Sequence, residues 1–117
     1  MEIDLSYLRE MSGGNKELIL EMITIFTSQV KDFGTEMDQL LESGQYEKLG
    51  KLAHKAKSSV SIMGLNDLAV NLKDLETSAA ERKNTESYGH IVDLFKNTTE
   101  EAIKELEIVT QNLDLYF

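Results

Sequence analysis

The stretch LGKLAHKAKSSVSIMG, residues 49–64, determines the fold class that we predict. When its residues advance by about 100° each, as in an α-helix, the apolar ones fall within about 60° of one direction. We therefore predict a helix over about 45–63 that buries this side in a core and ends at Gly64. The residues on the core side are Leu49, Leu52, Ala53, Ala56, Val60 and Met63.

Helical spacing recurs on both sides of this stretch. No proline interrupts the chain, and no segment alternates with a period of two residues, which argues against a sheet. We predict an all-α fold, an antiparallel up-down four-helix bundle with a short additional N-terminal helix. Its other helices are one at about 4–11, one from the cap Asn15 to Ser43-Gly44, one capped by Asn66 and ending near 81–84, and one at about 85–113.

Each of these helices has an apolar face that we expect to be buried. The face of the long helix after Asn15 holds Leu18, Met22, Ile25, Phe26, Phe33, Met37, Leu40 and Leu41. The face of the helix after Asn66 holds Leu68, Leu72, Leu75 and Ala79. The face of the last helix holds Ile91, Phe95, Thr98, Ala102, Leu106, Val109 and Leu113.

Length and composition predict a single domain, 1–117. With no cysteine, neither a disulfide framework nor a thiolate metal site is available. No run approaches the about 18 apolar residues that cross a bilayer, and Met1-Glu2-Ile3-Asp4 lacks the basic-then-apolar order of a signal peptide. We therefore expect no membrane partner and a cytoplasmic location. The formal net charge of −9 argues against nucleic acid.

Met1 and the compact length favour a free-standing protein, and a domain cut from a larger hybrid kinase is the alternative. Nothing in the sequence demands a dimer, so we expect a monomer.

One segment departs from the acidic balance. The range 48–66 contains no Asp or Glu, and the histidine His54 lies within it. A histidine in a basic segment of an acidic protein suggests a site that handles negative charge. The segment is too small for nucleic acid and suits a small acidic patch on another protein. We name it the lysine island, and its basic residues are Lys48, Lys51, Lys55 and Lys57.

His54 points about 140° away from the core direction of its helix, toward solvent. Its neighbours on the helix surface are the residues four before it and three, four and seven after it. Three of the four are small, which leaves clearance for a bulky group. These neighbours are Gly50, Lys57, Ser58 and Ser61.

An exposed neutral imidazole can attack an electrophile through Nε2. Its Nδ1–H then needs a fixed acceptor, which holds the tautomer and makes Nε2 more basic. The helix that carries His54 offers no such acceptor, because its glutamate, Glu47, is two turns away. Glu76 lies at the edge of the apolar face of the next helix, about 80° from its centre, and an antiparallel arrangement would bring it alongside. The alternative for Glu76 is a salt bridge with Lys73, three residues earlier.

A longer pattern surrounds the histidine. It reads His54-x-x-Lys57-Ser58-Ser59, then Gly64, then Leu68 and Leu72, then Leu75-Glu76. This pattern resembles the histidine-containing phosphotransfer (HPt) domain family of bacterial two-component phosphorelays. The part from Leu8 to Phe26 is similar to the family's opening helices. Ser58 stands where glycine is commoner and Ala56 where a larger apolar residue is common.

The resemblance implies a four-helix bundle with one phosphohistidine, here His54. It implies that Lys57 lies beside the phosphoryl group and that Glu76 orients the imidazole. The chain would be a phosphocarrier without independent catalytic activity, holding no cofactor and no metal. The expected partners are receiver domains of a hybrid histidine kinase and of a response regulator, which supply the phospho-aspartate and Mg²⁺. Lys51 and Lys55 would join Lys57 in neutralising charge and docking the receiver.

Other interpretations remain open. The bundle could bind a receiver domain without carrying phosphate, or it could be a structural bundle unrelated to signalling. His54 could be a solvated surface histidine, as we interpret His90, and the lysine island a solvated face. A di-metal carboxylate bundle would need Glu-x-x-His pairs, but Lys51 and Ser87 stand three residues before the two histidines.

Overall fold

The computed structural model describes residues 3–117 as an elongated bundle with extents of 46 × 20 × 20 Å. Met1 and Glu2, the first residues of the predicted domain 1–117, lie outside the described residues. The described residues contain helices and no strand, which confirms the predicted all-α class. The elements are α1 (Ser6–Ser12), α2 (Lys16–Glu42), α3 (Tyr46–Ile62), α4 (Asn66–Glu81), the 3-10 helix η1 (Thr85–Ser87), α5 (Tyr88–Gln111) and α6 (Leu113–Tyr116).

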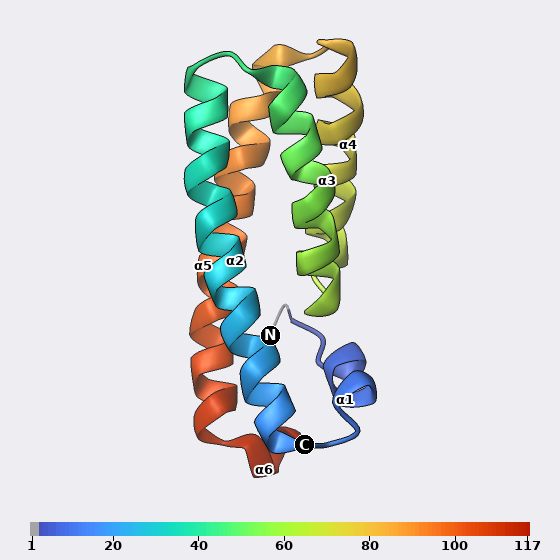
Figure 1. The fold of residues 1–117 in the computed structure, drawn as a ribbon, viewed down its shortest axis with the longest axis vertical. Helices are drawn as coiled ribbons and strands as arrows, with labels where there is room; N and C mark the ends of the chain where they lie inside the picture. Colours follow the sequence, from blue (N-terminus) through green and yellow to red (C-terminus); the bar gives the residue numbers. More distant parts are fainter. Residues whose placement is uncertain (1–2) are drawn as a thin grey trace.

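The four long helices α2 to α5 alternate in direction along the chain (Figure 1). Their contacts join α2 with α3, α3 with α4, α4 with α5, and α5 with α2, so the four helices close a ring. The 27 residues of α2 span about 40 Å, whereas the 17 residues of α3 span about 25 Å. The shorter pair α3 and α4 therefore covers only the upper part of α2 and α5, and α1 lies below them (Figure 1).

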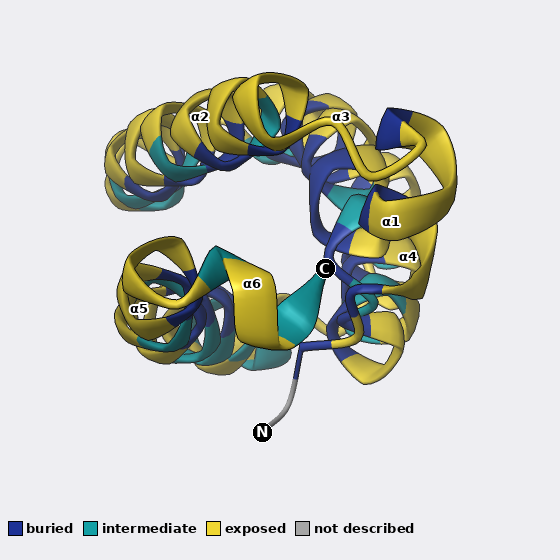
Figure 2. Cartoon of the chain, turned by 90° about the horizontal axis from the view of Figure 1, so that it is seen from below, coloured by how far each residue is buried: buried dark blue, intermediate teal, exposed yellow. Residues whose placement is uncertain are grey.

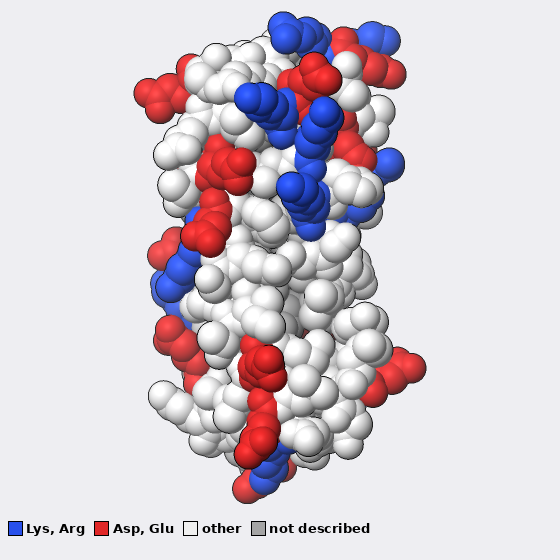
Figure 3. All heavy atoms as spheres, in the orientation of Figure 1, with Lys and Arg blue, Asp and Glu red and all other residues white. Residues whose placement is uncertain are grey.

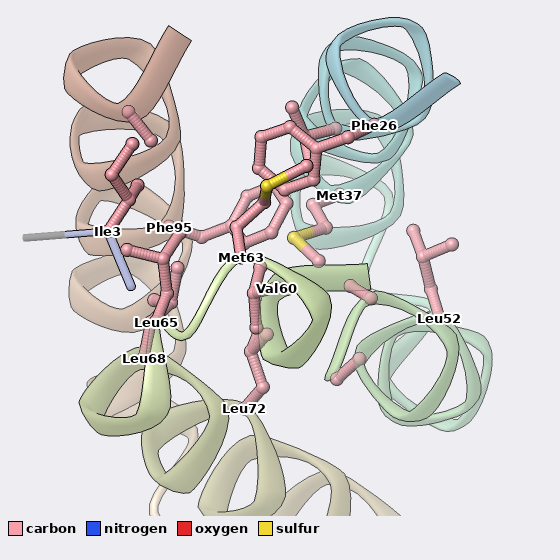
Figure 4. Close-up of a cluster of buried hydrophobic side chains, with 14 of the residues drawn as sticks. Ile3, Phe26, Met37, Leu52, Val60, Met63, Leu65, Leu68, Leu72 and Phe95 are labelled. Atoms are coloured by element: carbon pink, nitrogen blue, oxygen red, sulfur yellow. The ribbon is translucent and has the colours of Figure 1, made fainter. Parts of the chain in front are cut away.

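Apolar side chains from every long helix meet inside the bundle. Figure 2 shows the buried faces turned inward and the exposed faces outward. Figure 4 shows side chains from α2, α3, α4 and α5 meeting in one cluster, with Ile3 beside them. All the core residues predicted for α3 and α4 are buried, although Val70 on α4 is apolar and 61% exposed. No helix in the described residues is long and apolar enough to cross a membrane.

The predicted buried face of α2 is wrong in its first half. Leu18 and Ile25 are 37% and 49% exposed, whereas Ile19, Ile23 and Val30 are buried. This part of the helix is apolar on several sides, so its spacing alone does not fix which side is covered. Its contacts with α1 and α5 fix that side instead.

The start of α4 also differs from the prediction. Asn66 is the first helical residue and its side chain makes no capping bond, while Leu65 occupies the cap position. Leu65 is only 4% exposed, and its N–H donates to the carbonyl of Val60 at 3.1 Å. Burial of this leucine fixes how the chain enters the helix. In contrast, the predicted Asn15 cap of α2 is confirmed, since its side chain accepts from Leu18 N–H at 3.0 Å.

The ends of the chain depart from the predicted helix limits. The first helix begins at Ser6 instead of residue 4, because Asp4 N–H bonds to the carbonyl of Met63 at 2.9 Å and holds the preceding segment against the loop after α3. The predicted helix 85–113 is divided into η1, α5 and α6, with a break at Asn112, where φ is −135°. The buried positions of α5 include Val92 and Thr99, where we expected Ile91 and Thr98.

Tyr88 anchors the C-terminal end of α4 to the start of α5. Its ring is fully buried, and its hydroxyl lies 2.8 Å from the carbonyl oxygen of Ser78 and 2.6 Å from that of Lys83. The Ser78 carbonyl at the end of α4 also accepts from Lys83 N–H at 2.9 Å, so the hydroxyl adds a second donor there and supplies one to the Lys83 carbonyl just beyond the helix. Burial raises the pKa of the Tyr88 phenol, which therefore stays protonated as a donor.

We expect Tyr88→Phe to lower the free energy of unfolding by about 1–2 kcal/mol, because the Lys83 carbonyl loses this donor and the Ser78 carbonyl keeps only the one from Lys83 N–H. Urea unfolding followed by circular dichroism measures the change. Tyr46→Phe is the matched control, since the Tyr46 ring packs edge-on against Tyr88 at 5.1 Å but its hydroxyl makes no hydrogen bond within residues 3–117. Equal losses in the two variants would contradict the anchoring role.

Candidate functional site

The pairing of α3 with α4 brings His54 and Glu76 together. His54 stands on the outer side of α3 with its side chain 65% exposed, and Glu76 reaches it from the neighbouring α4. Nδ1 of the imidazole lies 2.7 Å from Oε1 and 3.2 Å from Oε2 of the carboxylate. The two residues are 22 positions apart in the sequence, so only the antiparallel packing of the two helices makes this contact.

Gly50 allows this close approach. A Cβ at this position would lie 3.1 Å from Ala79 Cβ and 3.2 Å from the carbonyl oxygen of Glu76, both on α4. We predicted Gly50 as part of the open surface around the histidine. It is buried instead, because it faces α4, while Ser58 and Ser61 are exposed as expected. The absence of a side chain at Gly50 thus serves the packing of α3 on α4, one turn before His54.

Three cationic or protonatable groups surround the Glu76 carboxylate. Besides His54, Lys57 Nζ lies 3.7 Å from Oε1 and Lys73 Nζ lies 3.6 Å from Oε2. The hydrogen bond with His54 lowers the pKa of Glu76 most strongly, and the charges of His54, Lys57 and Lys73 lower it further, while burial opposes them. Glu76 is therefore a carboxylate, which can only accept hydrogen bonds.

The acceptor fixes the tautomer of the histidine. Because a carboxylate faces Nδ1, the proton of a neutral imidazole resides on Nδ1, and Nε2 keeps a free lone pair. No hydrogen bond in the described part of the chain involves Nε2. An exposed Nε2 on a ring that the Glu76 carboxylate holds in place is suited to nucleophilic attack on an electrophile brought by another molecule.

The lysine island flanks this nitrogen. Lys51 and Lys55 line a hollow of about 490 Å³ together with His54, and Lys51 also lies 3.9 Å from Glu47. Lys57 lines a second hollow together with Lys73. Figure 3 shows basic side chains gathered over α3 in the upper half of the molecule, while acidic side chains follow α2. The positive charge is thus concentrated around His54 on an otherwise acidic protein.

The sequence prediction missed Lys73 as a member of the site. The sequence analysis named Lys73 only as an alternative partner of Glu76, because it stands three residues earlier in the same helix. In the structure the two contacts of Glu76 coexist: His54 Nδ1 lies nearest to Oε1, and Lys73 Nζ approaches Oε2. His90 is exposed on α5, and its side chain makes no hydrogen bond or ion pair with the residues that the structure describes. No group of three or more His, Cys, Asp or Glu side chains within residues 3–117 is placed to hold a metal ion.

Glu76→Gln gives a pH-dependent test of the carboxylate's contacts. The native pKa of Glu76 is lowered below its ordinary value of 4.5, so the unfolded chain binds this proton more readily than the folded one. The contribution to stability is therefore complete above about pH 4.5 and disappears as the pH falls through the folded pKa. We expect the stability difference between native protein and variant to shrink toward acid in urea unfolding. A difference that stays constant from about pH 3 to pH 7 would contradict these contacts.

Comparison with known proteins adds one finding. A family model described as the Hpt domain matches residues 21–107, which is well over half of the 117 residues and includes both His54 and Glu76. Searches of curated proteins and of solved structures each found no match.

Proposed function

The chain belongs to the Hpt domain family of phosphotransfer modules in two-component signalling, and on this basis we propose that it is a histidine phosphocarrier of a phosphorelay. In this proposal His54 accepts a phosphoryl group from the phospho-aspartate of one receiver domain and passes it to the aspartate of another. The observation that carries it is the exposed imidazole of His54, whose Nδ1 is held by the Glu76 carboxylate at 2.7 Å while Nε2 makes no hydrogen bond within residues 3–117.

The proposed step needs only groups that the two proteins bring. The Nε2 lone pair forms a bond to phosphorus as the bond between phosphorus and the aspartate oxygen breaks, and the aspartate carboxylate leaves with that electron pair. The proton already on Nδ1 stays there, so the ring gains positive charge. Glu76 would stabilise this charge, much as a carboxylate stabilises an imidazolium in other nucleophilic sites.

The cations and small residues around His54 fit a bulky anionic partner. Lys57, Lys51 and Lys55 would neutralise the phosphoryl group and steer the acidic pocket of a receiver. The exposed Ser58 and Ser61 would leave room for its approach. Mg²⁺ would come with the receiver, and this chain would add no catalysis of its own.

We propose that the partners are the receiver domains of a hybrid histidine kinase and of a response regulator, met by a monomer in the cytoplasm. Charge of opposite sign mainly raises the rate of encounter and fixes orientation, which suits a carrier that must bind and leave in turn.

Transfer from a phosphorylated receiver domain tests the proposal. Purified receiver is phosphorylated with labelled phosphate, mixed with the native chain, and both proteins are separated. We expect label on this chain that is labile in acid and stable in alkali, as a phosphohistidine is, and a phosphopeptide that contains His54. If several active receivers bind the chain and leave it unlabelled, the protein is a docking module instead of a carrier. If none binds, a structural bundle is the better interpretation.

A further inference from the structure

We propose that Lys73 is a positioning residue of the site, which holds the Glu76 carboxylate against His54 when Lys57 turns to the phosphoryl group. This role rests on the proposed phosphocarrier function but can be measured without it. Lys73 lies outside the lysine island, on α4 instead of α3.

The geometry of the carboxylate supports this role. The terminal torsion of a glutamate is broad, so contacts to a single ring nitrogen leave the plane of the group adjustable. In the structure His54 Nδ1 lies 2.7 Å from Oε1 and 3.2 Å from Oε2, and Lys73 Nζ lies 3.6 Å from Oε2, so Oε2 has a second partner besides His54. With Lys73 in place, rotation of the carboxylate away from Nδ1 would also break the second contact.

Lys57, the other lysine beside Glu76, cannot contact both the carboxylate and the phosphoryl group closely at the same time. Its Nζ lies 3.7 Å from Oε1 of Glu76, the same oxygen that accepts from His54. A phosphoryl group on Nε2 brings a charge of about −2, which attracts the same ammonium group to the opposite side of the ring. Once Lys57 turns toward that charge, Lys73 is the cation that stays with Glu76.

The Lys73 contact, in contrast, does not depend on the partner or on α3. Lys73 and Glu76 are three residues apart on one helix and move together. Lys57 must instead reach across from α3, and it is 27% exposed against 59% for Lys73. Because Lys73 is well exposed, its contact is screened by water and its effect is modest, about 2- to 5-fold on the transfer rate.

Three lysine variants isolate the charge of Lys73. Lys73→Met removes the charge and keeps most of the side-chain length, whereas Lys73→Arg keeps the charge and should restore the native rate. Lys83→Met is the matched control, because Lys83 pairs with Glu81 at the same 3.6 Å but lies away from His54. The other groups that act on the Glu76 carboxylate, His54 and Lys57 from α3, stay unchanged in all three variants.

Two readouts are needed. The first is the rate of phosphoryl transfer from a receiver, measured for Lys73→Met alone and in a Glu76→Gln background. We expect Lys73→Met to slow transfer about 2- to 5-fold alone and to have no further effect beside Glu76→Gln, since it acts through the carboxylate. The second is the carboxyl carbon resonance of Glu76 followed against pH. Lys73→Met should raise the pKa of Glu76, and Lys83→Met should not.

The outcomes separate the positioning role from the proposed function. If the native chain takes no label, the carrier function fails, and the Glu76 titration still decides the role of Lys73. If the native chain is labelled but Lys73→Met leaves both the rate and the Glu76 titration unchanged, the positioning role is overturned. An equal rate loss from Lys73→Met with and without Glu76 would also overturn it, since Lys73 would then act on the partner directly.

Discussion

His54→Gln is expected to abolish acceptance of the phosphoryl group, with a loss on the order of 10³-fold or more in transfer rate. A glutamine amide is similar in polarity but has no basic nitrogen with a free lone pair, so no bond to phosphorus can form. Because the His54 side chain is 65% exposed, the substitution should change the free energy of unfolding by less than about 0.5 kcal/mol. Labelling by a phosphorylated receiver and urea unfolding measure the two effects separately.

The matched control for this variant is His90→Gln. His90 is also an exposed histidine on a helix, but it belongs to α5 and has no carboxylate and lysine arrangement like that of His54. We expect this variant to be labelled like the native protein. Receiver binding by His54→Gln should persist, since the docking lysines remain. Native labelling of His54→Gln would exclude this residue as the acceptor.

Gly64→Ala is expected to destabilise the fold strongly, by about 2–5 kcal/mol. Gly64 has φ of +71°, where a side chain adds about 1–2 kcal/mol of strain. An added Cβ would also meet the Asp4 side chain, and would lie 2.8 Å from the Asp4 carbonyl oxygen and 2.9 Å from its Cα. Backbone cannot move aside as the end of a flexible side chain can, so the N-terminal segment must leave its place beside the loop.

Gly44→Ala separates the two causes. Gly44 has nearly the same φ, +70°, but a Cβ there meets nothing within 4 Å. We expect Gly44→Ala to lower the free energy of unfolding only by the backbone strain, about 1–2 kcal/mol. Thermal unfolding should show a fall in Tm of roughly 10 °C or more for Gly64→Ala and of about half that or less for Gly44→Ala. Equal falls would show that the contact with Asp4 contributes nothing.

The sequence predicted the all-α class because the spacing of apolar residues is clear in α3 and α4, where most residues outside the buried face are polar. It predicted the Asn15 cap and the chain reversal at Gly44, since these depend on local chemistry of one or two residues. It was wrong where more than one side of a helix is apolar, as at Leu18 and Ile25 of α2. It was also wrong where burial of a neighbour, Leu65, overrides a good capping residue, Asn66.

Some features of the candidate site could likewise be predicted from one segment of sequence, and others could not. The exposure of His54 follows from helical periodicity within one segment, and the charge of the lysine island follows from composition. The contacts of Glu76 do not follow, because they depend on how far α3 and α4 are shifted along each other and how closely they approach. Gly50 permits that approach through its neighbours on α4, which no local pattern displays.

By itself the sequence determined the fold class, the histidine that faces solvent and the basic segment around it, since each depends on the order of residues within one helix. Only the tertiary structure decided that His54 Nδ1 meets Glu76, that Lys57 and Lys73 approach different oxygens of its carboxylate, and that Gly50 is buried. These facts depend on the register between two antiparallel helices, which is fixed by the packing of side chains from all four helices and by no single segment.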